Sequence, residues 1–196
     1  MIETLAVLGG YLLGSMPFGY WVPLLLRHED IRTKGSGNVG ASNVFRVYGR
    51  SLGISVAALD LAKGFAAASL GLWAGGALVG VLAAGAAMIG HARPIFLRFE
   101  KGGKMVATAG GAAFALAPLA AVCCIGMWLV LFFVTRYASL ASIVTALGLP
   151  VFVVLFGYPW PVVAFGIAGA AAVIALHRQN IRRLLGGTEH RFQLGR

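Results

Sequence analysis

Apolar runs alternate with short polar segments along the chain, and this alternation predicts a bundle of membrane-spanning helices. The first run, residues 2–26, is long enough to cross a bilayer, which requires about 20 apolar residues. A polar segment at 27–50 follows, and a second apolar run then covers 52–73. An uncharged turn at 74–76 separates this run from a shorter one at 77–90.

The later apolar runs are too long to be single spans. Residues 106–135 would form a helix of about 45 Å, whereas the hydrocarbon core is about 30 Å thick. We expect Pro118 to divide this run, and the Gly- and Pro-containing stretch 157–161 to divide the next run, 140–176. The sequence thus predicts an all-α polytopic membrane bundle in a single domain, 1–196. It would have seven transmembrane helices, with five as the alternative.

The polar segments predict the orientation of this bundle. Either span count places an even number of spans between the segments 27–50, 91–104 and 177–196, so all three fall on one face. Every Lys and Arg except Lys63 lies in these segments or, for Arg136, in a short turn on the same side. Because basic residues concentrate on the cytoplasmic side, we expect the N-terminus outside and the C-terminus in the cytoplasm. An attraction of these charges to anionic lipid is the simpler alternative role.

Composition supports a membrane protein rather than a soluble domain. The chain is 59% hydrophobic and 11% charged, with a mean hydropathy of +0.86, whereas soluble domains are about one quarter charged. The net charge of +10 is explained by orientation, so we expect no nucleic-acid partner. The first run is long for a signal-peptide core and is not expected to be cleaved. The adjacent Cys123 and Cys124 lie in an apolar run and are interpreted as packing residues.

The first polar segment contains a stretch, 34–46, with the composition of a phosphate-binding loop. Its glycines allow backbone N–H groups to turn toward an oxyanion, and Lys34 and Arg46 can neutralise charge. An ordinary surface turn is the alternative, because turns are also rich in Gly, Ser and Asn. Residues 35–40 fit the dinucleotide fingerprint, but that motif requires a preceding strand, and here a predicted span precedes it.

The other polar segments add similar chemistry. Gly102-Gly103-Lys104 precedes a predicted helix, whose N-terminus favours anions. His177 and Asn180 are three residues apart and share a face if the last span continues. Within the second span, Asp60 and Lys63 also share a face, and we expect a buried structural ion pair there.

Four motifs in order resemble one family. They are Gly-Ser-Gly-Asn-x-Gly-Ala-x-Asn-x-x-Arg at 35–46, His91-x-x-Pro-x-Phe-x-x-Phe with Gly-Gly-Lys and Val-Ala-Thr, Arg136-Tyr-Ala-Ser-Leu-Ala-Ser-Ile, and His177-Arg-x-Asn-Ile-x-Arg-Leu-x-x-Gly-x-Glu. Together with Leu59-Asp60-x-x-Lys63-Gly64 they resemble, nearly end to end, the bacterial acyl-phosphate:glycerol-3-phosphate acyltransferase family (PlsY). Two departures are the extra residue Glu100 and Met105, which stands where the family usually has Gly.

The resemblance implies the first acylation of bacterial phospholipid synthesis. An acyl group would pass from acyl phosphate to the 1-hydroxyl of glycerol 3-phosphate, giving lysophosphatidic acid and inorganic phosphate. It implies no metal or organic cofactor, and an active site on the cytoplasmic face of the bacterial inner membrane, among membrane lipids. An acyl phosphate has a good leaving group, so the enzyme needs positioning and charge neutralisation more than a strong nucleophile. The sequence lacks a His-x-x-x-x-Asp motif, which argues against an acyl-carrier thioester enzyme.

On this resemblance we expect specific roles for the polar residues. Ser36, Gly37 and Asn38 would bind phosphate through hydroxyl and backbone N–H groups, while Arg46 and Lys104 would neutralise its charge. The remaining predicted substrate-binding residues are Gly35, Gly40, Asn43, Gly102, Gly103 and Ser142.

The tail residues would act on the acceptor. His177 and Asn180 would orient the glycerol backbone, and His177 is either a general base or only an orienting group, with the proton then taken by substrate phosphate. Glu189 is expected to be structural, and Ser139 and Ser142 to bind substrate or cap a helix. The rival functions are a small organic-anion transporter or channel, which would place polar groups near the membrane midplane, and a structural membrane protein with lipid-binding loops.

Overall fold

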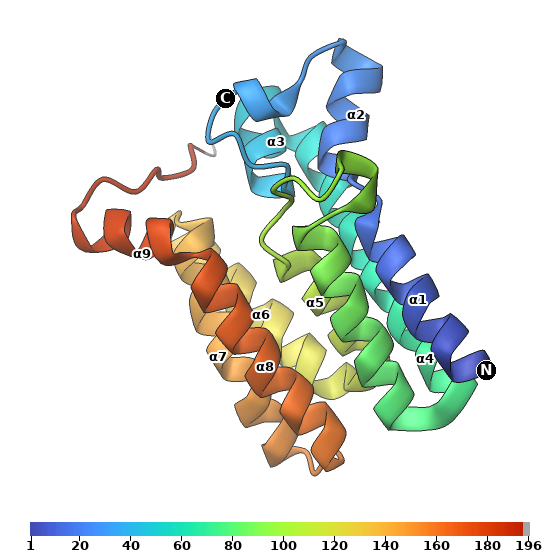
Figure 1. The fold of residues 1–196 in the computed structure, drawn as a ribbon. Helices are drawn as coiled ribbons and strands as arrows, with labels where there is room; N and C mark the ends of the chain where they lie inside the picture. Colours follow the sequence, from blue (N-terminus) through green and yellow to red (C-terminus); the bar gives the residue numbers. More distant parts are fainter. Residues whose placement is uncertain (194–196) are drawn as a thin grey trace. The chain divides into compact units, whose positions relative to one another are not determined.

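The structure, a computed structural model, describes residues 1–193 and is helical throughout, with no strand in that range (Figure 1). Arg196 of the predicted polar tail lies outside the described residues. The chain divides into two compact units, Met1–Leu116 and Ala117–Arg196, each described by itself. The elements of the first are α1 (Ile2–Ser15), α2 (Phe18–Arg27), the 3-10 helix η1 (Ile31–Thr33), α3 (Ala41–Tyr48), α4 (Arg50–Ala92), the 3-10 helix η2 (Ile95–Leu97) and α5 (Val106–Leu116). Those of the second are α6 (Pro118–Thr135), α7 (Ala138–Leu155), α8 (Trp160–Leu176) and α9 (Arg178–Leu185).

The first apolar run is broken at Met16 and Pro17, between α1 and α2. Met16 is extended (φ −61°, ψ 109°), as expected because a following proline disfavours helical geometry. The break makes the Met16 carbonyl available to a side chain, and Lys63 Nζ donates to it at 2.7 Å. The same Nζ lies 2.9 Å from Asp60 Oδ1, and both side chains are 2% exposed. The predicted buried ion pair is therefore confirmed.

Helix α4 consists of two arms that reverse direction at Gly75 and Gly76 (Figure 1). Gly76 has φ 73° and ψ −160°, a region open essentially only to glycine. The arms approach closely, so that a Cβ on Gly71 would lie 2.6 Å from the Val79 carbonyl oxygen. This reversal confirms the predicted turn at 74–76 and makes two antiparallel apolar helices from one continuous element.

Close helix packing in the first unit depends on residues without side chains. A Cβ on Gly14 of α1 would overlap the backbone of Ala87 in the second arm of α4. On α5, a Cβ on Gly111 would overlap the carbonyl oxygen of Leu61 in the first arm. Small residues that let backbones approach are typical of helix packing in membranes. These contacts place the polar loops 28–49 and 93–105 next to each other at one end of this unit.

The second unit confirms the two breaks predicted from proline and glycine. Ala117, before Pro118, has φ −151° and ψ 70°, so α5 and α6 are separate helices. Between α7 and α8 the chain passes through Gly157 at φ 69° and Pro159. Cys123 and Cys124 form no disulfide, as expected, and Cys124 is buried.

The helices have the composition of a membrane bundle. By length and hydropathy, four segments of the described residues could cross a membrane, or five if the bent pair α8 and α9 counts as one span. One of these four contains both arms of α4, and the 11-residue α5 is apolar but shorter. Large apolar side chains also face outward, including Leu5, Phe133 and Val134, which are 57–73% exposed. Such surfaces are suited to lipid rather than to water.

Candidate active site

Asn43 organises the first polar loop. Its side-chain oxygen accepts a hydrogen bond from the Ser36 N–H at 2.9 Å. Its amide nitrogen donates to the Lys34 and Asn38 carbonyls at 3.1 and 2.9 Å. Asn43 is 2% exposed, so its amide shapes the loop. Its predicted substrate contact is not needed to explain its position.

Several backbone N–H groups of this loop, those of Ser36, Gly37 and Gly40 among them, donate within the loop itself. Gly37 N–H donates to the Lys34 carbonyl at 3.0 Å, and Gly40 N–H donates to Asn38 Oδ1 at 2.9 Å. The sequence predicts that the N–H groups of Ser36, Gly37 and Asn38 bind phosphate, and those of Ser36 and Gly37 already have partners in the loop. Ser36 is exposed and its N–H maintains the loop, and the binding of phosphate by its hydroxyl stays a prediction. Gly35, at φ 56°, leaves no room for a Cβ beside the Asn43 side chain.

A small apolar core supports the loop from beneath. Val39 of the loop and Val44 of α3 are buried against Ile31 and Val56, with Tyr20 of α2 packed at the edge. This core holds α3, and with it the exposed Arg46, in a defined position. The stretch 34–46 is thus an ordered structure built on α3.

The second loop is anchored to the end of α4. Gly102 and Gly103 donate their N–H groups to the carbonyls of Ala92 and His91 at 2.9 and 3.0 Å. A Cβ on Gly103 would overlap the His91 ring. The glycines therefore have a packing role in addition to the predicted approach of substrate. Lys104, half-buried, follows them and is separated from α5 by Met105.

His91 was present in a recognised motif, but its role could not be predicted from sequence. Its Nδ1 lies 3.5 Å from Asp60 Oδ1, so the ring lies between the buried ion pair and Gly103. The feature of the sequence that could have indicated this contact is Asp60, because a carboxylate within the membrane requires polar partners.

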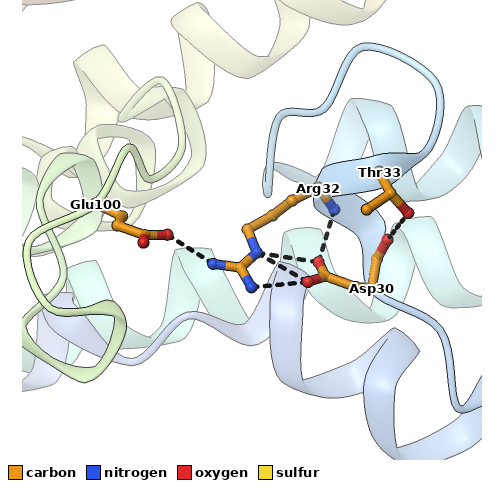
Figure 2. Close-up of polar contacts among 4 residues, drawn as sticks. All are labelled: Asp30, Arg32, Thr33 and Glu100. Atoms are coloured by element: carbon orange, nitrogen blue, oxygen red, sulfur yellow. Dashed lines mark hydrogen bonds and ion pairs between the residues drawn. The ribbon is translucent and has the colours of Figure 1, made fainter.

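Hydrogen bonds from Asn38 and Arg32 join the first and second polar loops. Asn38 Nδ2 donates to the Gly102 carbonyl at 3.3 Å. Arg32 Nη1 donates to Glu100 Oε2 at 2.6 Å, while the rest of its guanidinium binds Asp30 (Figure 2). These hydrogen bonds from Arg32 hold the pKa of Asp30 below its usual value, despite the opposing effect of burial. This cluster was not predicted from the sequence, in which the acidic Glu100 in a basic loop is the one local signal for it.

An open cavity of about 500 Å³ lies beside the first loop, lined by Arg27, Glu29, Lys34, Val47 and Tyr48. Glu29 accepts a hydrogen bond from Tyr48 at 2.8 Å, and its carboxylate lies 3.3 Å from Lys34 Nζ. These two hydrogen bonds lower the pKa of Glu29, and burial together with this carboxylate raises the pKa of Tyr48 to about 12. Lys34 belongs to the predicted phosphate-binding stretch, but the residues predicted to be catalytic or to bind substrate do not line this cavity.

In the second unit, His177 lies at a bend of 62° between α8 and α9. The last span therefore does not continue straight, but the Ile181 N–H still bonds to the His177 carbonyl at 2.9 Å. Asn180 thus lies one turn after His177, and both are buried. His177 Nδ1 lies 2.8 Å from the Val173 carbonyl. This geometry favours the Nδ1–H tautomer, in which Nε2 carries the lone pair of the neutral ring.

Glu189 connects α9 to α7. Its Oε1 accepts from Ser139 and Asn180 at 2.7 and 2.6 Å, and its Oε2 accepts from Arg183 at 2.6 Å. Burial raises the pKa of Glu189, but these donors together hold it below the usual value. The predicted structural role of Glu189 agrees with this network, and Ser139 belongs to it.

Ser142 has helix-packing partners. Its hydroxyl donates to the Ala138 carbonyl at 2.7 Å and accepts from Trp128 Nε1 at 3.1 Å. These contacts satisfy a buried serine on α7, and the predicted substrate contact of Ser142 stays a prediction.

The helices and loops define a class of protein: a multi-pass, all-helical membrane protein that carries cationic, glycine-rich loops suited to anionic substrates. Comparison with known proteins identifies the member of this class. The sequence model of the glycerol-3-phosphate acyltransferase family matches residues 4–187. The chain belongs to this family, and it is a membrane acyltransferase.

Relatives and solved structures cover the chain almost completely. A glycerol-3-phosphate acyltransferase of Synechococcus sp. (strain JA-2-3B'a(2-13)) is 46% identical over 191 residues, 97% of this chain and 95% of the relative. Glycerol-3-phosphate acyltransferase 2 of Moorella thermoacetica is 47% identical over 95% of this chain and 96% of its own. The crystal structure of PlsY (YgiH), an integral membrane glycerol 3-phosphate acyltransferase, in its glycerol 3-phosphate form is 42% identical. It has a TM-score of 0.93 and covers 97% of this chain and 96% of that chain.

Proposed function

We propose that the protein transfers a fatty acyl group from acyl phosphate to the 1-hydroxyl of glycerol 3-phosphate. The hydroxyl oxygen attacks the acyl carbon, the bond from that carbon to the phosphate oxygen breaks, and inorganic phosphate leaves. The products are lysophosphatidic acid and phosphate. The solved PlsY structures support this proposal, because one is a glycerol 3-phosphate form and another, 41% identical, is a lysophosphatidic acid form.

The observation that carries the proposal is the arrangement of the two loops in the first unit. The exposed Ser36 and Arg46 lie in the segment 28–49. Asn38 of the same segment donates a hydrogen bond to Gly102, which is two residues before Lys104. In our proposal the Ser36 hydroxyl donates a hydrogen bond to phosphate, and Arg46 and Lys104 neutralise the charge that develops on the leaving group. The N-terminus of α5, just after Lys104, adds a favourable dipole.

We propose that His177 and Asn180 serve the same reaction by orienting glycerol 3-phosphate. Support comes from their shared turn and from the Glu189 network that fixes Asn180. The tautomer held by Val173 would let Nε2 accept a hydrogen bond from the attacking hydroxyl. His177 would then either take the hydroxyl proton as a base or leave it to the substrate phosphate.

We also propose that the chain crosses the bacterial inner membrane seven times, with the three polar segments in the cytoplasm and the N-terminus outside. The two breaks in the later apolar runs and the distribution of Lys and Arg support this topology. It would place the loops where both soluble glycerol 3-phosphate and a lipid-like acyl phosphate can reach them.

The decisive assay uses the purified full chain in detergent with palmitoyl phosphate and glycerol 3-phosphate. We expect release of inorganic phosphate that depends on both substrates and requires no thioester. Arg46→Ala should nearly abolish this release without loss of folding, because it removes the guanidinium that neutralises phosphate. Arg27→Ala, which removes another exposed cation, is the matched control and should retain activity. Full activity in Arg46→Ala would exclude the role given to Arg46, and absence of phosphate release by the wild type would exclude the reaction.

A further inference from the structure

Arg32 of the first polar loop is held in place by Asp30 and by the ring of Tyr20. Its Nε lies 3.0 Å from both Asp30 carboxylate oxygens and its Nη2 lies 2.7 Å from Oδ2 (Figure 2). Its backbone N–H also donates to Asp30 Oδ1 at 2.9 Å, which caps η1. The guanidinium carbon lies 4.8 Å from the centre of the Tyr20 ring of α2. These contacts fix the plane of the guanidinium, and they therefore also fix the direction in which its Nη1 group can donate.

The Nη1 group of Arg32 points to the second polar loop. Arg32 Nη1 donates to Glu100 Oε2 at 2.6 Å, and Figure 2 shows this bond crossing from one loop to the other. The guanidinium is therefore neutralised by two carboxylates, Asp30 and Glu100. Because two carboxylates already neutralise its charge, Arg32 is less suited to attract a substrate phosphate itself.

The ion pair supplements a weaker link between the same loops. Asn38 Nδ2 and the Gly102 carbonyl are 3.3 Å apart, which makes this a long hydrogen bond between uncharged groups. Glu100 is two residues before Gly102, and Arg32 is six residues before Asn38. The ion pair therefore restricts the relative orientation of the loops at a second position, away from the Asn38 bond.

We propose that Arg32 is a positioning residue, which acts through Glu100 to hold loops 28–49 and 93–105 in the arrangement that binds glycerol 3-phosphate. The inference rests on the proposed function for the identity of this ligand. Because Arg32 and Glu100 are 35% and 61% exposed, their contribution to overall stability is small. Loss of this ion pair should therefore weaken the binding of glycerol 3-phosphate, because it changes the arrangement of the loops and not the overall fold.

The test is a double-mutant cycle on the full chain in detergent. Glu100→Gln keeps the side-chain shape but removes the charge. We expect it to raise the Kd of glycerol 3-phosphate in calorimetry, and its KM, by about two- to five-fold, the range of an exposed ion pair. The kcat at saturating glycerol 3-phosphate and the Tm should stay unchanged. Arg32→Gln should have at least this effect, and the double variant should bind no worse than Arg32→Gln. The difference from wild type should shrink with added salt, which screens the pair.

Glu29→Gln is the matched control. Glu29 lies in the same loop and binds Lys34 and Tyr48, so its replacement makes the same charge change without affecting a contact between loops. A Kd for Glu100→Gln equal to that of wild type, additive effects of Arg32 and Glu100, or an equal loss in Glu29→Gln would overturn the positioning role. A wild-type protein that neither binds glycerol 3-phosphate nor releases phosphate would instead overturn the proposed function, and with it this inference.

Discussion

Glu189 is a single side chain on which the placement of Asn180 depends. Its side chain is 5% exposed, and it accepts hydrogen bonds from Ser139, Asn180 and Arg183. A carboxylate with these donors is stabilised in its charged form, and this stabilisation exceeds the effect of burial. The charge of Glu189 therefore contributes to the stability of the second unit and to the geometry of α9.

The contribution of Glu189 should depend on pH. Its folded-state pKa lies below the ordinary value of 4.5, so the stabilisation is fully present above 4.5 and is lost as the pH falls through the folded value. We expect Glu189→Gln to lower the free energy of unfolding at pH 7 by about 1–3 kcal/mol, as for charge-assisted hydrogen bonds. Thermal unfolding from pH 7 to pH 3.5 should show the difference from wild type narrowing below pH 4.5. A constant difference over this range would contradict the assigned charge.

In the first unit, some glycines lie in direct contact with the backbone of a neighbouring helix. Gly111 and Gly110 are neighbours on α5, but only at Gly111 would a Cβ overlap backbone, the Leu61 carbonyl oxygen of α4. At Gly110 the nearest atom to a Cβ is Leu61 Cδ2, at an ordinary 3.4 Å. Backbone cannot yield as a flexible side chain does, so the two glycines differ in their tolerance of a methyl group.

We therefore expect Gly111→Ala to destabilise the protein by about 1–3 kcal/mol, the usual cost of overpacking. Gly110→Ala should be neutral or slightly stabilising, because alanine is the better helix former. Thermal unfolding in one detergent measures both variants. Because α5 follows Lys104, Gly111→Ala should also reduce activity. Equal behaviour of the two variants would show that α4 and α5 do not pack as described.

The whole chain carries its polar loops in both units, so orientation in the membrane decides whether they can serve one reaction. Our proposal needs the segments 27–50, 91–104 and 177–196 on the same side. Both candidate span counts satisfy this condition, but they place the turn at Arg136 and Tyr137 on opposite sides. A cysteine in this turn therefore distinguishes seven spans from five.

Single cysteines in a chain lacking Cys123 and Cys124 test this topology. We expect Ile2→Cys to react with an impermeant maleimide in intact cells. Thr33→Cys, Lys101→Cys and His190→Cys should react only after the cells are opened, and Tyr137→Cys should behave like them if there are seven spans. Labelling of Thr33→Cys and His190→Cys from opposite sides would make the proposed common reaction impossible. Labelling of Tyr137→Cys in intact cells would favour five spans.

Helices and their breaks could be predicted from the sequence because both depend on local composition. Apolar runs of sufficient length become helices, and Pro17, Gly76 and Pro118 interrupt them through their own backbone restrictions or freedom. The ion pair of Asp60 and Lys63 was also predictable, since helical spacing places them on one face. The family was recognisable because its motifs are continuous stretches of residues.

Roles that depend on distant partners could not be assigned in this way. The role of Asn43 in ordering the loop depends on Ser36, Lys34 and Asn38, and its predicted substrate contact stays a prediction. The role of Arg32 depends on Glu100, 68 residues away along the chain. His91 meets Asp60 and Gly103 only after α4 has turned back on itself. Local backbone preference and hydrophobicity act over a few residues, so they specify the helices. The partners of a polar side chain are set by packing, which brings residues together regardless of their separation along the chain.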